Sequence, residues 1–214
     1  MWGPDEERRV TRPVSIRPTN RLTELRRQTE VLVDRGYPEL AGLDPGAFRA
    51  LVARLAIRLP DERFVLVVSG ALVPCHRMVE HIALGGRPGF TTMDADDLAR
   101  FQAIPDLVRP SSPVYLVVDV DTGGDTRNVR PDDALPGITA AGRTPLTVEE
   151  GLAVVTQFPE WLRERNCFQM LGSRAGDRRV TGLWVSRGAP RLGWCWAGNP
   201  HSWLGMASAA RRVG

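Results

Sequence analysis

The stretch VYLVVDVDTGGDT, residues 114–126, holds the clearest strand of the sequence and its most prominent pair of acids. Its first half is apolar and β-branched, which is typical of a buried strand. Side chains alternate along a strand, so Asp119 and Asp121 are expected on one side, about 7 Å apart along the backbone. Two carboxylates at the end of an apolar strand are candidates for acid–base chemistry. The stretch therefore predicts a core strand that ends in a candidate catalytic pair.

Several protein classes carry a similar pattern of acids. A haloacid-dehalogenase-type phosphatase is excluded, because its chemistry needs a lysine and the chain has none. An aspartic protease needs two Asp-Thr-Gly loops, so the single one at 121–123 would require a homodimer. A metal-dependent nucleotide-sugar transferase needs a repeated βα fold ahead of its acids, but the sequence shows only one convincing strand there. A calcium-binding loop is disfavoured, because Gly123 would occupy a position that needs a ligand side chain. The alternative without chemistry is a turn shaped by Asp121 and Gly123.

Periodicity and capping residues predict the elements around this stretch. A helix over residues 20–38 is expected to be capped by Asn20, and a second one over 44–60 by Asp44, with Pro45 in its first position. The pattern further predicts a strand at 63–70, a helix or strand at 74–86, a helix at 94–104, helices at 130–142 and 144–165 broken at Pro136 and Pro159, and a strand at 167–173.

Residues 181–198, TGLWVSRGAPRLGWCWAG, predict a β-hairpin that turns around Arg187–Pro190. We expect a single α+β domain over residues 19–214, with N-terminal helices, a central sheet and a C-terminal Trp-rich β-hairpin, after a flexible arm over residues 1–18. Alternation in the hairpin places Trp184 and Cys195 on one face and Leu183, Val185, Leu192, Trp194 and Trp196 on the other.

The composition excludes several functions. All 28 basic residues are arginine, so lysine-anchored pyridoxal phosphate, a P-loop and protein-kinase chemistry are ruled out. The net charge is only +3 and the arginines are scattered, which makes nucleic acid an unfavoured partner. Three cysteines fit a reducing cytosol. The N-terminal residues lack the apolar segment of a secretory signal, and no apolar run is long enough for a bilayer, so we expect a cytoplasmic protein without a membrane partner.

Two further segments are candidates for ligand binding. The loop GSRAGDRRV, residues 172–180, brings Arg174, Arg178 and Arg179 close to glycine-rich backbone, where paired N–H donors bind a carboxylate or phosphate. The segment WCWAGNPHSW, residues 194–203, offers an aromatic pocket rim with polar groups. The alternatives are a solvated loop and a hairpin packed on the core. The ligand-binding residues predicted in the second segment are Trp194, Trp196, Asn199 and His201.

Metal binding and thiol catalysis are weaker hypotheses. Residues 75–81 hold Cys75, His76, Glu80 and His81, but without the spacing of a zinc site, so no metal ligand is predicted. Cys195 and His201 form a candidate thiol–imidazole pair, which would require an exposed thiol with a lowered pKa. The alternative in both places is a small buried cysteine of the core.

Four strings of the sequence resemble a known family. YLVVDVDTG, NVRPDDALPGITAAGRTPLTVEEG, LGSRAGDRRVTGLWVS and GWCWAGNPHSWLG follow one another in this order, and the similarity runs from Phe64 to Leu204. Together they resemble a family of uncharacterised actinobacterial proteins, grouped as a domain of unknown function. The resemblance implies a cytosolic bacterial protein of about this size. It implies no reaction, cofactor or catalytic residue.

We therefore expect a protein that binds a small polar or anionic ligand at a pocket lined by the aspartates, arginines and tryptophans named above. If it is an enzyme, carboxylate-assisted hydrolysis or transfer by Asp119 and Asp121 is the expected reaction. The alternative is an interaction module that docks through the Trp-rich hairpin. The sequence identifies no cofactor, and it leaves a homodimer open.

Overall fold

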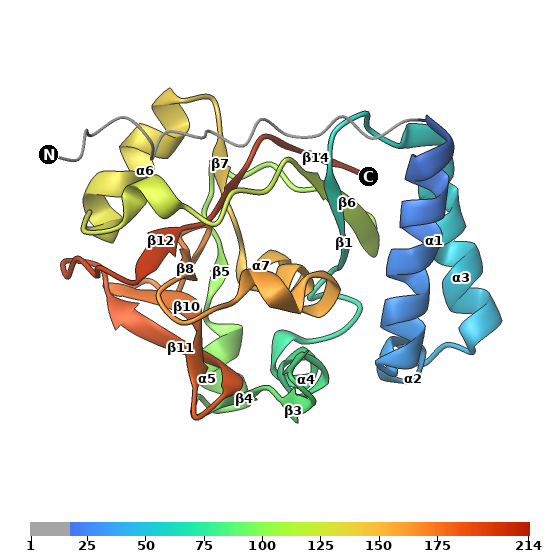
Figure 1. Ribbon diagram of the computed structural model, residues 1–214, viewed down its shortest axis with the longest axis horizontal. Helices are drawn as coiled ribbons and strands as arrows, with labels where there is room; N and C mark the ends of the chain where they lie inside the picture. The colour runs from blue at the N-terminus through green and yellow to red at the C-terminus, as the bar shows by residue number, and fades with distance from the viewer. Residues whose placement is uncertain (1–17) are drawn as a thin grey trace, which may run out of the picture.

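The computed structural model describes residues 18–214. The arm predicted for residues 1–18 lies outside this range, except for Pro18, which already begins the first helix. The described residues form one α+β domain. Its two largest sheets, one antiparallel with three strands and one mixed with five strands, enclose a central helix, and further helices lie on the flanks (Figure 1). The predicted fold class is therefore confirmed.

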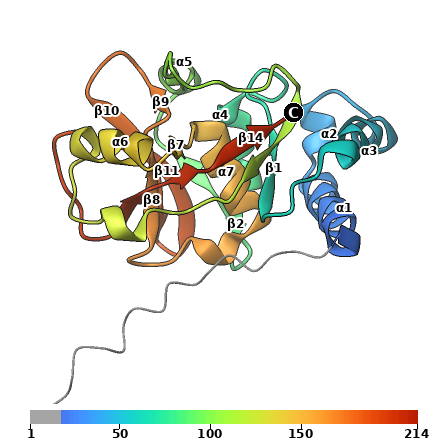
Figure 2. The same ribbon diagram turned by 90° about the horizontal axis from the view of Figure 1, so that it is seen from above.

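The N-terminal helices form a layer at one end of the molecule (Figures 1 and 2). The predicted cap position, Asn20, lies inside the first helix, because that helix begins at Pro18. Asp44 caps the third helix as predicted, with its carboxylate accepting the N–H groups of Gly46 and Ala47 at 2.8 and 3.0 Å. The elements of this layer are α1 (Pro18–Asp34), α2 (Tyr37–Leu40), α3 (Pro45–Ala53) and the 3-10 turn η1 (Arg54–Arg58).

The strand predicted from VYLVV lies in the middle of a three-stranded antiparallel sheet. Its neighbours are the strand predicted from FVLVV and the C-terminal strand. Helix α1 covers the open edge of this sheet, since the Gln28 amide donates to the Phe64 carbonyl at 2.9 Å and accepts the Leu66 N–H at 2.6 Å. The strands are β1 (Phe64–Val68), β6 (Val114–Val118) and β14 (Arg211–Val213).

The predicted hairpin lies in a second, five-stranded sheet. Its two-residue turn consists of Arg187 and Gly188, both with positive φ, which matches the twist of the strands it joins. Leu183 pairs with Leu192 and Thr181 with Trp194, so the predicted alternation of faces is confirmed. The strands, in sheet order, are β12 (Leu204–Met206), β8 (Cys167–Met170), β10 (Arg179–Ser186), β11 (Ala189–Trp196) and β4 (Phe90–Thr91).

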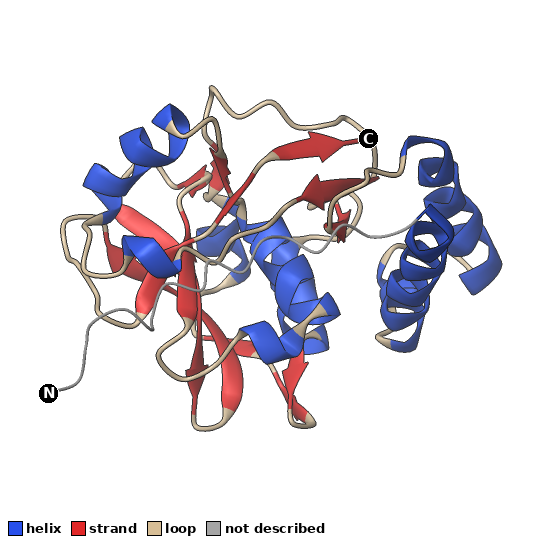
Figure 3. Ribbon diagram, turned by 45° about the horizontal axis from the view of Figure 1, so that its top comes forward, coloured by secondary structure: helices blue, strands red, loops and turns tan. Residues whose placement is uncertain are grey.

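Helix α7 (Val148–Gln157) lies between the two sheets (Figure 3). All ten of its residues are buried. It ends before Pro159, as predicted. Helix α6 (Pro131–Ala140) covers the outer face of the five-stranded sheet with Ala134 and Ile138. The break predicted at Pro136 is wrong, because α6 continues through it. Pro136 has no N–H, so the helical hydrogen bond to the Asp132 carbonyl in the first turn is lost. Asp132 is exposed to water.

Short elements connect these layers. The helix predicted for residues 94–104 is confirmed only in its first half, since Gln102 and Ala103 are in a strand. Residues 74–86 contain both a helix and a strand. These elements are α4 (Cys75–Met78), η2 (Val79–His81), β2 (Ala83–Leu84), β3 (Arg87–Pro88), α5 (Ala95–Ala99), β5 (Gln102–Ala103), η3 (Gly124–Thr126), β7 (Thr144–Pro145), η4 (Pro159–Trp161), β9 (Ser173–Arg174) and β13 (Ser208–Ala209).

Candidate functional site

The two predicted catalytic aspartates do not share one side of a strand. Strand β6 ends at Val118, and Asp119 has a φ of 53°, so the chain turns away before the acids are reached. The Asp119 carboxylate accepts a hydrogen bond from Arg143 at 2.9 Å, and its carbonyl accepts a second one from the same guanidinium at 2.6 Å. Asp119 therefore joins β6 to the segment that follows α6.

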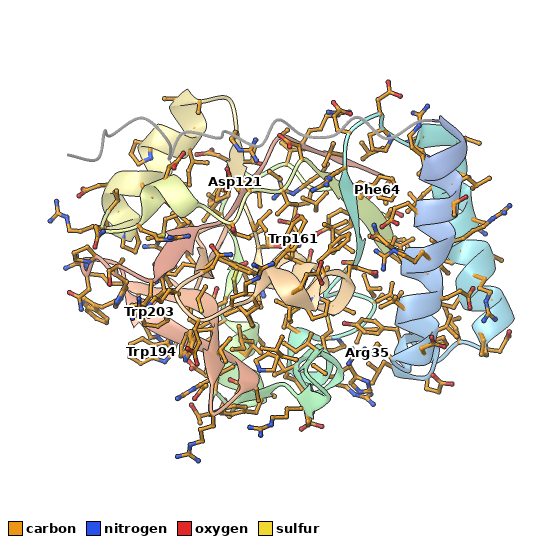
Figure 4. The ribbon with its side chains drawn as sticks, in the orientation of Figure 1. Arg35, Phe64, Asp121, Trp161, Trp194 and Trp203 are labelled. Atoms are coloured by element: carbon orange, nitrogen blue, oxygen red, sulfur yellow. The ribbon has the colours of Figure 1, made fainter. Side chains whose placement is uncertain are left out.

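Asp121 shapes the turn that the sequence offered as the alternative. Its carboxylate accepts the N–H of Gly123 at 2.6 Å, and its backbone pairs with Ser208 in both directions at 2.9 Å. Figure 4 shows Asp121 well apart from Trp194 and Trp203. No hydrogen bond or ion pair within residues 18–214 links either aspartate to the predicted arginines. The predicted Asp/Arg/Trp pocket is therefore not assembled.

We expect Asp119→Asn to lower the free energy of unfolding by about 1 kcal/mol, because a partly exposed ion pair is lost while asparagine still tolerates a positive φ. Asp119→Ala should cost roughly 1 kcal/mol more, since alanine is strained in the left-handed region. Urea unfolding of the two variants measures the difference. Equal losses would contradict the geometric account of Asp119.

The predicted arginines lie together with two of the predicted tryptophans. Arg179 donates to both carboxylate oxygens of Asp97 at 2.8 Å, and its guanidinium lies 5.4 Å from the Trp194 ring and 5.2 Å from the Phe101 ring. The ion pairs with Asp97 raise the pKa of Arg179. Arg174 and Arg178 both pair with Asp132, at 3.6 and 3.2 Å, and Arg178 lies over the Trp196 ring at 5.8 Å.

Asn199 and His201 lie beyond this cluster. The Asn199 N–H donates to the Trp196 carbonyl in an exposed turn. His201 contacts the ring of Trp203, with centroids 5.6 Å apart, and burial lowers its pKa. Burial also raises the pKa of Cys195 to about 11, so this thiol is the opposite of an activated nucleophile.

Of the residues of the metal hypothesis, Cys75 and His76 line one cavity, and His81 lies apart from them. The ring of His81 bonds to the Arg35 carbonyl at 2.5 Å, while Cys75 faces Glu149. Within residues 18–214, no group of three or more His, Cys, Asp or Glu side chains is arranged to hold a metal ion. In the same range, no helix is both long and apolar enough to cross a bilayer.

A pocket that the sequence did not predict lies at the N-terminus of α7. It has a volume of about 340 Å³ and is bounded by α4, α5, the start of α7 and the loop after β1. One wall is apolar, with Leu98 and Phe101, and Phe101 connects it to the stacked Arg179 and Trp194. The polar lining consists of Ser69, Gly70, Cys75, His76, Gln102, Arg109, Thr147, Glu149 and Ser173.

Glu149 is the buried acid of this pocket. One carboxylate oxygen accepts Arg109 at 2.6 Å and the Tyr115 hydroxyl at 2.7 Å, and the other accepts the N–H of Gly70 at 2.6 Å. A Cβ at position 70 would lie 2.7 Å from a carboxylate oxygen of Glu149, so a larger residue here would displace that carboxylate. Burial and this carboxylate raise the pKa of Cys75 to about 12.

A second acid lies directly behind the first. Glu150, fully buried, forms two hydrogen bonds with the Arg212 guanidinium at 2.5 and 2.7 Å and accepts the Thr147 N–H at 2.8 Å. The Tyr115 hydroxyl lies 3.1 Å from Glu150 and so bridges the two acids. Burial, and then Glu150 and Glu149, raise the pKa of Tyr115. Two carboxylates and two guanidiniums balance in charge, and the Glu149–Arg109 pair lines the pocket while the Glu150–Arg212 pair does not.

Arg109 has free bonding capacity on the pocket side. Its side chain is 34% exposed against 6% for Glu149, and its one hydrogen bond in the described structure runs from Nη1 to Glu149. A guanidinium carries five N–H donors, so most of them are available to a ligand. Although burial acts against its charge, Glu149 and Tyr115 raise the pKa of Arg109 and keep it cationic.

Comparison with known protein families adds one finding. A model described as a family of unknown function (DUF5701) matches residues 31–214. The chain belongs to this family. No curated protein and no solved structure matches the chain. The matched residues of this DUF5701 protein include the whole Glu149–Glu150 network, from Gly70 to Arg212.

The sequence contained only a partial signal for this site. In the DUF5701 chain, Thr147 and Glu150 have the spacing of a helix-capping box, which places Glu150 in the first turn of α7. Nothing local indicated Arg109, since it lies in a loop 40 residues before Glu149. Gly70 is 79 residues away from the carboxylate that it contacts. The pocket therefore depends on tertiary contacts that no local pattern encodes.

Proposed function

We propose that the protein binds a small organic anion in the pocket at the N-terminus of α7. The observation that carries this proposal is Arg109, a cation anchored by a buried carboxylate and left with unused donors facing a cavity. Guanidinium groups bind carboxylates and phosphates through pairs of N–H donors. The proposed ligand is of the class predicted from the sequence, but the proposed site differs from the predicted pocket of aspartates, arginines and tryptophans.

The chemistry of the pocket favours an anion over a cation. Glu149 accepts three hydrogen bonds and is almost fully buried, so it has little capacity left for a ligand. Residues Thr147 to Glu149, at the positive end of the α7 dipole, line the same cavity. The apolar wall of Leu98 and Phe101 suits a hydrocarbon body next to the anionic group.

The same arrangement supports binding more than catalysis. A general base needs a free lone pair within reach of its substrate. Arg109, Tyr115 and Gly70 occupy three of the roughly four lone-pair sites of the Glu149 carboxylate, which is almost fully buried. The carboxylate-assisted reaction predicted for Asp119 and Asp121 has no support in the contacts of these two residues, so we propose a ligand-binding protein.

The compartment is part of the proposal. We place the protein in the bacterial cytoplasm, in keeping with the resemblance to actinobacterial proteins. All three of its cysteines are free thiols in the structure, which fits a reducing environment.

Calorimetric titration with benzoate, a carboxylate with a small apolar body, tests the proposal. Arg109→Gln should weaken benzoate binding about tenfold or more, since a hydrogen bond to a charged group is worth roughly 1.5–3 kcal/mol. Inorganic phosphate, which lacks the apolar body, should bind more weakly than benzoate and lose affinity in the same variant. The control is Arg54→Gln, an exposed arginine of η1 that does not line the pocket.

Equal benzoate affinity of Arg109→Gln and Arg54→Gln would contradict the proposal. So would the absence of benzoate and phosphate binding to the unchanged protein at millimolar concentration. Circular dichroism verifies that both variants keep their fold, which is expected because the Arg109 side chain is one-third exposed.

A further inference from the structure

Two exposed tryptophans lie on a face of β11 that is otherwise part of the core. Trp194 and Trp196 follow Leu192 on this face by strand alternation, and Leu192 is fully buried. Each tryptophan is nevertheless 43% exposed. The other exposed large apolar side chains of the described residues, Leu22, Ile57 and Val108, come from separate segments. Among these exposed side chains, Trp194 and Trp196 are the two that lie next to each other on one strand face, which we call the tryptophan face.

The tryptophan face is held rigid by arginines. Arg179 lies between the rings of Phe101 and Trp194, and Asp97 fixes it with two hydrogen bonds of 2.8 Å. Arg178 lies over the Trp196 ring at 5.8 Å. Rings held in place lose little conformational entropy when a partner covers them. Tryptophan and arginine are also the residues that most often anchor protein interfaces.

The charges around the tryptophan face are of both signs. Arg178 pairs with Asp132 at 3.2 Å next to Trp196, and Arg100 pairs with Asp177 at 3.6 Å on the side of Arg179. A nucleic acid would require a surplus of unpaired positive charge, which these arginines do not provide. A surface with both signs around an apolar centre is instead complementary to a second copy of itself. A net charge of +3 adds little repulsion between two copies.

We propose that the tryptophan face forms a twofold contact between two copies of this chain. In a contact of this type the same patch serves both partners, so Trp194 and Trp196 of one copy cover those of the other. The arginine–aspartate pairs then exchange partners across the rim, with Arg178 and Arg100 facing aspartates of the second copy. The contact lies outside the anion pocket and does not depend on a ligand.

Sedimentation velocity of the full chain, from roughly 1 to 200 µM, detects a dimer with a dissociation constant in the micromolar range. We expect a monomer–dimer equilibrium in this range. Trp194→Ser combined with Trp196→Ser should weaken dimerisation at least about tenfold, as expected for interface anchors. The control is Ile57→Ser, which removes an apolar side chain that is 87% exposed elsewhere, and it should leave the equilibrium unchanged.

A second variant keeps both indoles in place. Asp132→Arg reverses one rim charge and should weaken the dimer several-fold through like-charge repulsion. A chain that stays monomeric over the whole concentration range would overturn the proposal. A dimer that persists unchanged in the Trp194→Ser/Trp196→Ser variant would overturn it as well, because the contact would then lie on another surface.

Discussion

Replacement of Arg212 by methionine should lower the free energy of unfolding by about 3–5 kcal/mol, because the Glu150 carboxylate would be left buried without its partner. Both side chains are almost completely shielded, with exposed fractions of 4% for Arg212 and 0% for Glu150. Arg212 also donates to the Thr144 hydroxyl and the Pro145 carbonyl, at 2.6 and 3.0 Å. The variant therefore removes the link between strand β14 and the start of α7.

The neighbouring residue provides a matched control. Arg211 lies in the same strand and forms an ion pair with Glu62 at 2.8 Å, but its side chain is 46% exposed. Arg211→Met should therefore cost only about 0–1 kcal/mol. Urea unfolding measures both variants. If Arg212→Met costs no more than Arg211→Met, the buried network does not anchor β14 to the start of α7. Adding Glu150→Leu to Arg212→Met should recover part of the loss, since the unpaired charge is then removed.

Replacement of Gly123 by alanine should cost about 3 kcal/mol or more. Gly123 has a φ of +80°, where alanine is strained by about 1–2 kcal/mol. An added Cβ would also lie 2.3 Å from the backbone nitrogen of Met206, so β12 would have to move, and such overpacking adds roughly 1–3 kcal/mol. The glycine of the DTG segment is therefore required for the close approach of this turn to β12.

The Gly124→Ala variant is a control for Gly123→Ala, because it replaces the adjacent glycine without the same steric conflict. Gly124 has no positive φ, and the nearest atom to its Cβ would be the Arg127 guanidinium nitrogen at 3.6 Å. We expect Gly124→Ala to change the thermal midpoint of unfolding by little, while Gly123→Ala lowers it strongly. Similar midpoints for the two variants would show that the turn adjusts without cost, contrary to the structure.

Elements with strong local signals were predictable. Asp44 caps α3, the hairpin turns at Arg187 and Gly188, and β1 and β6 coincide with the apolar runs FVLVV and VYLVV. In each of these places the local preference and the tertiary packing favour the same structure. The α+β class followed from the irregular mixture of such elements.

The predictions from the sequence were wrong where a single backbone angle, or a single contact between distant residues, determines the structure. The positive φ of Asp119 ends β6 early and separates the two aspartates, which alternation had placed together. Helix α6 tolerates Pro136 because the residue that loses a partner is exposed. The pocket joins Gly70, Arg109 and Glu149 from three distant segments. Clustered charges and tryptophans are visible in the sequence, whereas nothing in it shows that Gly70, Arg109 and Glu149 meet at one pocket.

Nuclear magnetic resonance of the arginine side chains during a benzoate titration tests the central claim most directly. The Nε–H signal of each arginine reports its own surroundings, and variants such as Arg109→Gln identify the signals. We expect the Arg109 signal to shift most, while those of Arg174 and Arg178 stay in place. If the largest shift occurred at Arg174 or Arg178 and the Arg109 signal were unchanged, the proposed site would be wrong. The ligand would then bind at the arginine cluster that the sequence predicted.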